Sequence, residues 1–233
     1  MKIKSLLLSS SLLLAATSQA ATLDVSVTNL THGVYFAPLL ISAHDSSTHF
    51  YALGSAASTE LQAMAEGGDI SGLATYATGM GAVNMENPAS GMLPPATTTD
   101  AMDIDTGDNM YLSIVGMMVP TNDGFIGLDA WPIPTTTGTY TLYLNGYDAG
   151  TEANNEIVVG PSAGMPGTPG IPGNPGGQGG AGATGVTAEE LNPTVHIHRG
   201  NLGDTMADGG MSDLDSRVHR WLNPVAKVVI TVK

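Results

Sequence analysis

The chain contains no cysteine, few basic residues and few aromatic ones, with 7 Lys and Arg, 3 Phe, 2 Trp and 7 Tyr in 233 residues. Without cysteine, no disulfide can stabilise the fold, so stability must come from apolar burial, backbone pairing or a bound ion. The 21 Asp and Glu residues give a formal charge of −14. Because nucleic acids and anionic membrane surfaces are bound through clustered Lys and Arg, we expect neither as a partner. Closely spaced carboxylates instead favour divalent cations.

The first twenty residues have the three-part pattern of a secretory signal peptide. Lys2 and Lys4 precede a mostly apolar run over residues 6–16, and small residues follow it, ending at Ala20. The run is too short to span a bilayer with ease, and no later stretch reaches the ~20 apolar residues of a membrane helix. We therefore predict a secreted protein, periplasmic or extracellular, with no membrane insertion and with a mature chain that spans residues 21–233.

Alternation of apolar and polar residues over 22–28 has the period of two that predicts a half-buried strand. A short helix is predicted near residues 59–66, where Thr59 and Gln62 have capping-box spacing and two glycines follow. The other strand-like runs are residues 34–41, 110–119, 124–128, 139–144, 195–198 and 225–232. Seven or so strands with one short helix are typical of an all-β sandwich, and the mature length fits a single domain.

A Gly/Pro-rich segment over residues 161–186 interrupts this pattern, with glycine at every third place from Gly164 to Gly185. The repeat is collagen-like, and one hypothesis is a stalk that trimerises the protein. The other is a flexible, exposed loop inserted between two strands. Because strand-like sequence flanks the segment, both of its ends must return to one domain, which a rod-like triple helix opposes. We therefore predict a loop in a monomeric protein.

Two acidic segments follow strand-like runs. Asp123 and Asp129 belong to the first segment, and Asp148 and Glu152 belong to the second. If the preceding strands are neighbours, the two loops converge at one end of the sandwich and supply three or four carboxylates. Carboxylate oxygens are the ligands that a hard cation such as Ca²⁺ prefers.

Three histidines offer a different metal chemistry. His196 and His198 are two residues apart on a predicted strand, so their rings should lie on one face of it. With His219 as a third ligand, they could bind a transition metal. The alternative is a pair of strand histidines that face solvent.

Five segments, spread over nearly the whole mature chain, have motifs of one known family. They are residues 29–38, 63–69, 118–127, 147–152 and 224–230. These segments resemble the spondin domain, which occurs in F-spondin, in mindin and in many bacterial secreted proteins. The two most specific motifs are MVPTNDGFIG at 118–127 and YDAGTE at 147–152.

The resemblance implies an eight-stranded antiparallel β-sandwich of the calcium-dependent lipid-binding type, with one Ca²⁺ held by Asp123, Asp148 and Glu152. The family commonly has aspartate at the third place, so Glu152 is a departure, as are the collagen-like insert and the missing cysteines. Animal relatives act in matrix attachment and cell adhesion.

From this resemblance we expect a calcium-binding, non-catalytic binding or adhesion module whose partner is an unknown extracellular protein or glycan. The alternative is a secreted metalloenzyme or transition-metal carrier that uses His196, His198 and His219.

The signal peptide is expected to be cleaved after Ala20, because Ser18 and Ala20 place small residues where signal peptidase needs them. Intact-mass spectrometry of the exported protein should therefore give a chain that begins at Ala21. Exported protein that still begins at Met1 would contradict this prediction.

Overall fold

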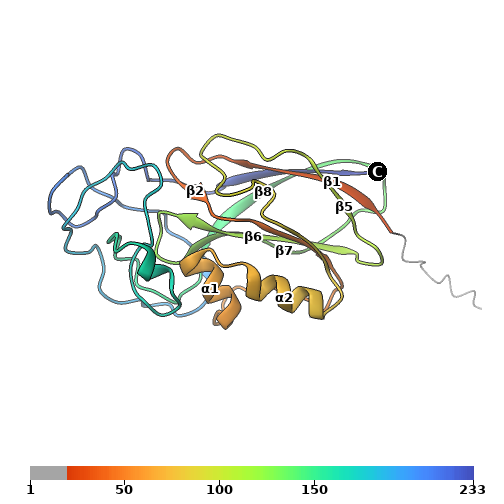
Figure 1. Ribbon diagram of the computed structural model, residues 1–233, viewed down its shortest axis with the longest axis horizontal. Helices are drawn as coiled ribbons and strands as arrows, with labels where there is room; N and C mark the ends of the chain where they lie inside the picture. The colour runs from red at the N-terminus through yellow and green to blue at the C-terminus, as the bar shows by residue number, and fades with distance from the viewer. Residues whose placement is uncertain (1–19) are drawn as a thin grey trace, which may run out of the picture.

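The computed structural model describes residues 20–233 and has an all-β architecture (Figure 1). The predicted signal peptide lies outside the described residues, apart from Ala20. The strands of the described part are β1 (Thr22–Asn29), β2 (Tyr35–Phe36), β3 (Leu40–His44), β4 (Val83–Glu86), β5 (Met102–Asp105), β6 (Tyr111–Val119), β7 (Gly124–Pro132), β8 (Gly138–Asp148), β9 (His196–Ile197) and β10 (Ala226–Val232). Every pairing between these strands is antiparallel.

Eight of the strands follow one another in the order β4-β3-β6-β7-β8-β10-β1-β5. The two-residue strands β2 and β9 are added beside β6 and β8. Strand β8 belongs to both layers, because residues 138–144 pair with β10 and residues 145–148 pair with β7. A strand that changes partners in this way forms a corner between two packed layers. The eight-strand path confirms the predicted antiparallel all-β fold.

The core lies between the two layers. Leu23, Val25 and Val27 of β1 are fully buried, and the residues between them are not, as the alternation predicted. Val25 lies opposite Ile230 of β10, and both pack in one cluster with Ile114 of β6. Side chains that alternate in this way fill the space between two sheets of a sandwich.

Two helices cover the outer face of the layer that contains β6 and β7 (Figure 1). They are α1 (Thr59–Gly67) and α2 (Ser71–Gly79). Helix α1 begins after Ser58, whose hydroxyl accepts a hydrogen bond from the Leu61 N–H at 3.1 Å, and it ends at Gly68 in the left-handed conformation. Residues 59–66 are therefore helical as predicted, with Ser58 as the cap.

The second helix corrects the prediction of a single one. Its nine residues include Gly72, Gly79 and two threonines, which are weak helix formers. Its stability comes from tertiary packing, since Leu73 and Ala77 are buried in the same cluster as α1. None of the helices among residues 20–233 has the length and apolarity needed to cross a membrane.

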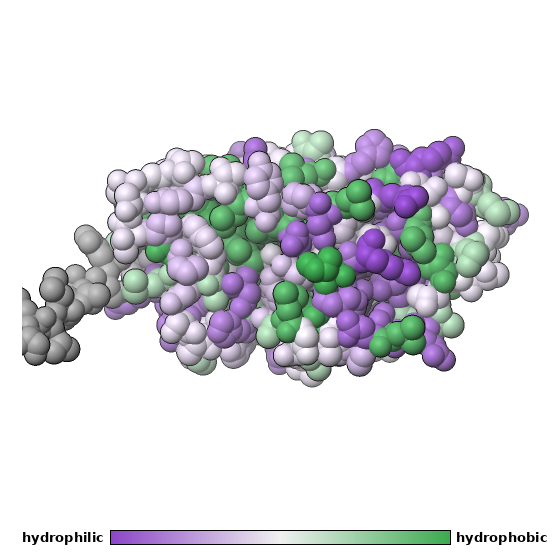
Figure 2. Space-filling model, turned by 180° about the vertical axis from the view of Figure 1, so that it is seen from behind, coloured by the Kyte–Doolittle hydropathy of each residue, from purple (hydrophilic) through white to green (hydrophobic). Residues whose placement is uncertain are grey.

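The long connections between residues 149 and 225 gather at the end of the sandwich opposite the C-terminus (Figure 1). Figure 2 shows the molecule from behind, where hydrophobic residues form small groups separated by hydrophilic ones. Scattered apolar residues are normal on a soluble surface, so this face gives no argument for a broad apolar interface.

The Gly/Pro-rich segment is a loop, as predicted. We expected this loop to be exposed, but parts of it are packed onto the domain. Ala163 and Ile171 are fully buried, and the Ile171 N–H donates to the Ile157 carbonyl at 2.8 Å. Gly167 and Gly170 have φ of 77° and 122°. A collagen chain needs φ near −75° at every residue, so these backbone angles are incompatible with a triple helix.

Two glycines of the repeat should differ in their tolerance of alanine. A Cβ on Gly170 would lie 2.4 Å from a methyl group of Val159 and would force the residue to keep its positive φ. A Cβ on Gly173 meets nothing within 4 Å, and this glycine has an ordinary φ. Strain of this kind costs about 1–3 kcal/mol, so Gly170→Ala should lower the melting temperature by several degrees while Gly173→Ala leaves it unchanged. Equal effects of both substitutions would favour a collagen-like role for the repeat.

Candidate cation site

Strands β7 and β8 bring two of the predicted carboxylates together. Asp123 directly precedes β7, Asp148 ends β8, and Gly124 of β7 lies opposite Asp148 in the ladder. The Ala149 N–H donates to the Asp123 carbonyl at 3.2 Å, which closes the junction between the two loops. The predicted convergence of these two loops is therefore present in the fold.

Asp123 is fully buried, and only one of its carboxylate oxygens has partners. Oδ2 accepts hydrogen bonds from the Thr151 N–H at 2.8 Å, the Thr151 hydroxyl at 3.2 Å and the Glu152 N–H at 3.1 Å. Oδ1 is buried and has none. Burial, followed by the charge of Asp148, raises the pKa of Asp123 to about 8. Negative charge at this carboxylate is therefore poorly compensated by the protein.

Asp148 is held by the turn that it begins. Its Oδ1 accepts from the Gly150 N–H at 2.8 Å, and its Oδ2 accepts from the Asn154 side-chain amide at 2.6 Å. Burial raises its pKa, against these hydrogen bonds and the nearby imidazole of His196, whose Nε2 lies 3.8 Å from Oδ2. The turn brings the Glu152 N–H to the Asp123 carboxylate, to which it donates a hydrogen bond.

Glu152 is also buried, and one of its oxygens lacks a partner. Oε2 accepts from the Gly170 N–H at 2.9 Å and from the Asn122 side-chain amide at 3.3 Å, while Oε1 has no hydrogen bond. Burial raises the pKa of Glu152 to about 7, and the charge of Glu66 adds to the effect. The Gly/Pro-rich loop therefore supplies a donor to a carboxylate of the site.

Glu66 is a member of this acidic group that the sequence analysis did not identify. It lies on α1, is fully buried, and accepts from Gln62 Nε2 at 2.8 Å and from the Gly167 N–H at 2.7 Å. In the sequence, the only indication of its role is its position in the last turn of the predicted helix, directly before two glycines. A glutamate that is buried at such a position needs polar partners.

Asp129, the fourth acidic residue of the two segments, does not join the group. It lies within β7, where its Oδ2 pairs with His49 Nδ1 at 2.6 Å and its Oδ1 accepts from the Phe50 N–H at 2.8 Å. The sequence analysis placed Asp129 in an acidic loop, but this position is a continuation of strand β7.

The chemistry of these side chains suits a hard cation, since buried carboxylate groups on adjacent loops carry negative charge that the protein compensates poorly. Two buried carboxylate oxygens, Asp123 Oδ1 and Glu152 Oε1, accept no hydrogen bond from any described residue. Among residues 20–233, no three His, Asp or Glu side chains are already close enough together to enclose an ion. The oxygens would therefore have to draw together around it.

His196, His198 and His219 do not form a transition-metal site in the described part of the chain. His198 Nδ1 accepts from the Gly200 N–H at 2.9 Å, and His219 Nδ1 accepts from the Asp215 N–H at 3.0 Å. A neutral imidazole with an accepting Nδ1 carries its proton on Nε2, and both Nε2 atoms are buried without partners. Neither Nε2 offers a lone pair to a metal.

Burial accounts for the neutral state of both rings. It lowers the pKa of His198 to about 3, and it lowers the pKa of His219 as well. His198 packs against Trp221, with ring centroids 5.0 Å apart. His198 and His219 are therefore buried, neutral histidines of the protein interior.

The raised carboxylate pKa values predict how pH affects the calcium-free protein. At pH 7–9 the folded state retains protons on Asp123 that the unfolded state has already released, so the free energy of unfolding should fall as the pH rises through about 8. Urea denaturation in chelator at pH 7 and pH 9 measures the loss, and Asp123→Asn should reduce it.

A matched control for this experiment is Asp100→Asn, which removes a charge from an exposed position. It should leave the pH dependence as in the wild type. A loss of stability that is the same in wild type and Asp123→Asn would show that another group is responsible.

Comparison with known proteins gives one finding on the family. The Spondin_N family model matches residues 28–166, which is more than half of the 233-residue chain. The matched segment includes Asp123, Asp148 and Glu152, and it ends within the Gly/Pro-rich loop. None of the curated proteins compared with the chain matches it. The chain therefore belongs to the Spondin_N family.

Proposed function

We propose that this protein is a secreted, calcium-binding module of the extracytoplasmic space that acts in binding or adhesion and performs no catalysis. Membership of the Spondin_N family indicates an extracellular type of module. The predicted signal peptide agrees with export, and the absence of cysteine from the chain leaves a bound ion as one remaining means of stabilising it. The partner that we propose is an extracellular protein or glycan.

The observation that carries the calcium proposal is the unpaired Oδ1 of Asp123. A buried carboxylate oxygen without a partner costs free energy, because nothing replaces the water that it lost. Its neighbour Glu152 has a second such oxygen. A cation bound to these atoms would supply the missing positive charge. Asp148 would contribute its remaining lone pairs, since each of its oxygens accepts one hydrogen bond from the protein.

Calcium suits this place better than magnesium. Ca²⁺ accepts six to eight oxygens in a flexible arrangement, whereas Mg²⁺ demands near-octahedral geometry and gives up its waters reluctantly. The longer side chain of Glu152, at a position where the family commonly has aspartate, is compatible with such a flexible shell. The carboxylates are also held by backbone N–H groups, which restricts their movement towards an ion to small adjustments.

Binding at this place would strengthen the part of the fold with the least regular structure. Asp123 lies in the connection between β6 and β7, Asp148 ends β8 where the next connection begins, and Glu152 is attached to the Gly/Pro-rich loop through Gly170. A cation between them would hold three loops in one arrangement. A rigid set of loops on a sandwich is what a binding module needs, because less order has to be gained when the partner binds.

Calcium should therefore stabilise the protein, and Asp123→Asn should remove most of this effect. At a hundred times its dissociation constant, a ligand that binds only the folded state adds about 2.7 kcal/mol. In Asp123→Asn the amide oxygen can keep the hydrogen bonds from Thr151 and Glu152, so the calcium-free variant should be as stable as the wild type or more so. Thermal melts with calcium, magnesium and chelator measure these differences.

Asp100→Asn again serves as the control for loss of a charge, and it should retain the full calcium effect. Metal analysis of the purified protein complements the melts. A melting temperature that is indifferent to calcium and chelator, in a protein that contains no calcium, would overturn the calcium proposal and leave the family membership intact.

A further inference from the structure

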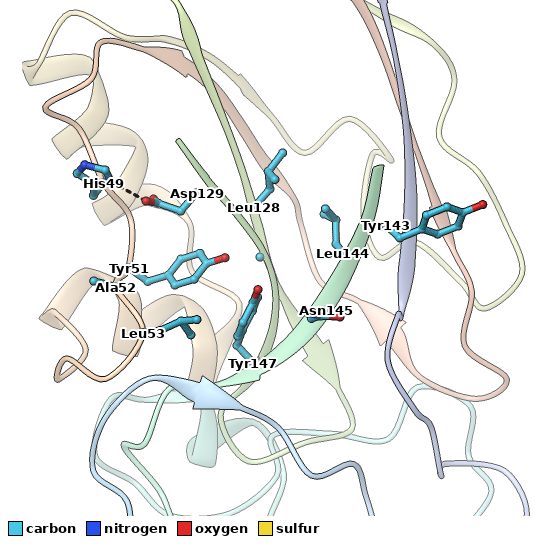
Figure 3. Close-up of a pocket in the computed structure, with 11 residues that line it drawn as sticks. His49, Tyr51, Ala52, Leu53, Leu128, Asp129, Tyr143, Leu144, Asn145 and Tyr147 are labelled. Atoms are coloured by element: carbon cyan, nitrogen blue, oxygen red, sulfur yellow. Dashed lines mark hydrogen bonds and ion pairs between the residues drawn. The ribbon is translucent and has the colours of Figure 1, made fainter. Parts of the chain in front are cut away.

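A cleft opens where β7 and β8 separate. The two strands pair only as far as Gly127 and Asn145, because from Leu144 backwards β8 pairs with β10 in the other layer. The resulting cleft has a volume of about 610 Å³ and is closed on one side by residues 49–53, which follow β3 (Figure 3). This size is in the range of small-molecule binding sites, about 300–1,000 Å³.

Aromatic side chains form the inner wall of the cleft. The rings of Tyr51 and Tyr147 are 5.1 Å apart, and Tyr51 meets the edge of Phe125 at 5.2 Å. In Figure 3 the hydroxyls of both tyrosines point into the space between the strands. A Cβ on Gly127 would lie 2.6 Å from the Tyr51 hydroxyl, so the floor of the cleft has to be glycine. Burial raises the pKa of Tyr51, which keeps its phenol neutral.

The polar groups of the cleft differ in their freedom to bind a ligand. Both oxygens of Asp129 are occupied, one by His49 and the other by the Phe50 N–H. The side-chain amide of Asn145 and the phenol of Tyr143 make no hydrogen bond with any described residue. Tyr143 is 62% exposed at the rim. The cleft therefore offers neutral donors and acceptors together with aromatic surface.

These properties select the chemistry of the ligand. An anion is disfavoured by the carboxylate of Asp129 and by the net charge of the chain. A cation would have to compete with His49 for Asp129, because the Oδ2 of this carboxylate is already paired with His49 Nδ1 at 2.6 Å. A purely apolar ligand would leave the amide of Asn145 without a partner. A neutral polyhydroxylated ligand can pack its C–H groups on tyrosine rings and hydrogen-bond with the amide and phenol groups.

We propose that this cleft binds a neutral saccharide unit of an extracellular glycan. The inference rests on the proposed role as a binding module and specifies its partner, and none of the proposed calcium ligands lines the cleft. The strand divergence supplies the space, the tyrosines supply rigid amphipathic contact area, and Asn145 fixes the orientation of the sugar hydroxyls.

The test uses isothermal titration and saturation-transfer NMR of the mature protein with three neutral trisaccharides: cellotriose, maltotriose and tri-N-acetylchitotriose. At least one should bind. Tyr143→Ala and Asn145→Ala should each weaken that binding at least tenfold. The matched control is Tyr76→Ala, which removes a partly exposed tyrosine from α2, outside the cleft, and should bind as the wild type does.

Three results would overturn the proposal. The first is that none of the trisaccharides binds. The second is that one binds, but Tyr143→Ala and Asn145→Ala bind it as tightly as the wild type does. The third is that tetramethylammonium ions bind in the cleft in place of sugars, as in an aromatic cage for cations. Thermal melts check that each variant is folded, and Asn145→Ala loses no hydrogen bond in the protein. The calcium melt is made on the same sample, so that failure of the cleft and failure of the cation site are separate outcomes.

Discussion

Buried carboxylates that accept hydrogen bonds from backbone N–H groups hold the irregular end of this sandwich together. Glu156 is the clearest case, because its two oxygens accept from the N–H groups of Leu202 and Gly203 and from the Ser212 hydroxyl. Asp213 connects Val158 to Ala183 in the same way. Such charge-assisted bonds are about twice as strong as neutral ones and fix loops that have no ladder of their own. In a chain without cysteine they do the work that disulfides do elsewhere.

The same principle distinguishes the proposed cation site from these anchors. The carboxylate oxygens of Glu156 are all occupied by protein donors, whereas Asp123 and Glu152 each retain a buried oxygen with none. Thr151 and Gly170 donate to one oxygen of each carboxylate, and the other oxygen of each receives no hydrogen bond. Repulsion from the charge of Asp148 then adds to the cost of burying Asp123, and both effects raise the pKa of Asp123. A structural anchor and a cation site thus differ only in whether the last lone pairs are satisfied.

The sequence predicted the regular part of the fold well and the irregular part poorly. The period of two in β1 and the capping pattern near Ser58 are local, so residues 22–29 and α1 were found close to their observed bounds. Helix α2 was missed because packing, and not its own residues, stabilises it. Asp123, Asp148 and Glu152 were identified from family motifs, while Glu66 was not, since only the folded chain brings α1 beside the Gly/Pro-rich loop. The conformation of that loop also depends on distant anchors, which a local repeat pattern does not reveal.

One strand connects the two places to which we assign binding. Tyr147 of β8 lines the cleft, and the next residue, Asp148, belongs to the acidic group. Successive residues of a strand point to opposite faces, so the two sites share a backbone without sharing a surface. Any ion that fixes Asp148 also fixes the end of β8, and with it the position of the Tyr147 ring against Tyr51. If an ion binds at the acidic loops, the order gained there would therefore extend along β8 to Tyr147 in the cleft.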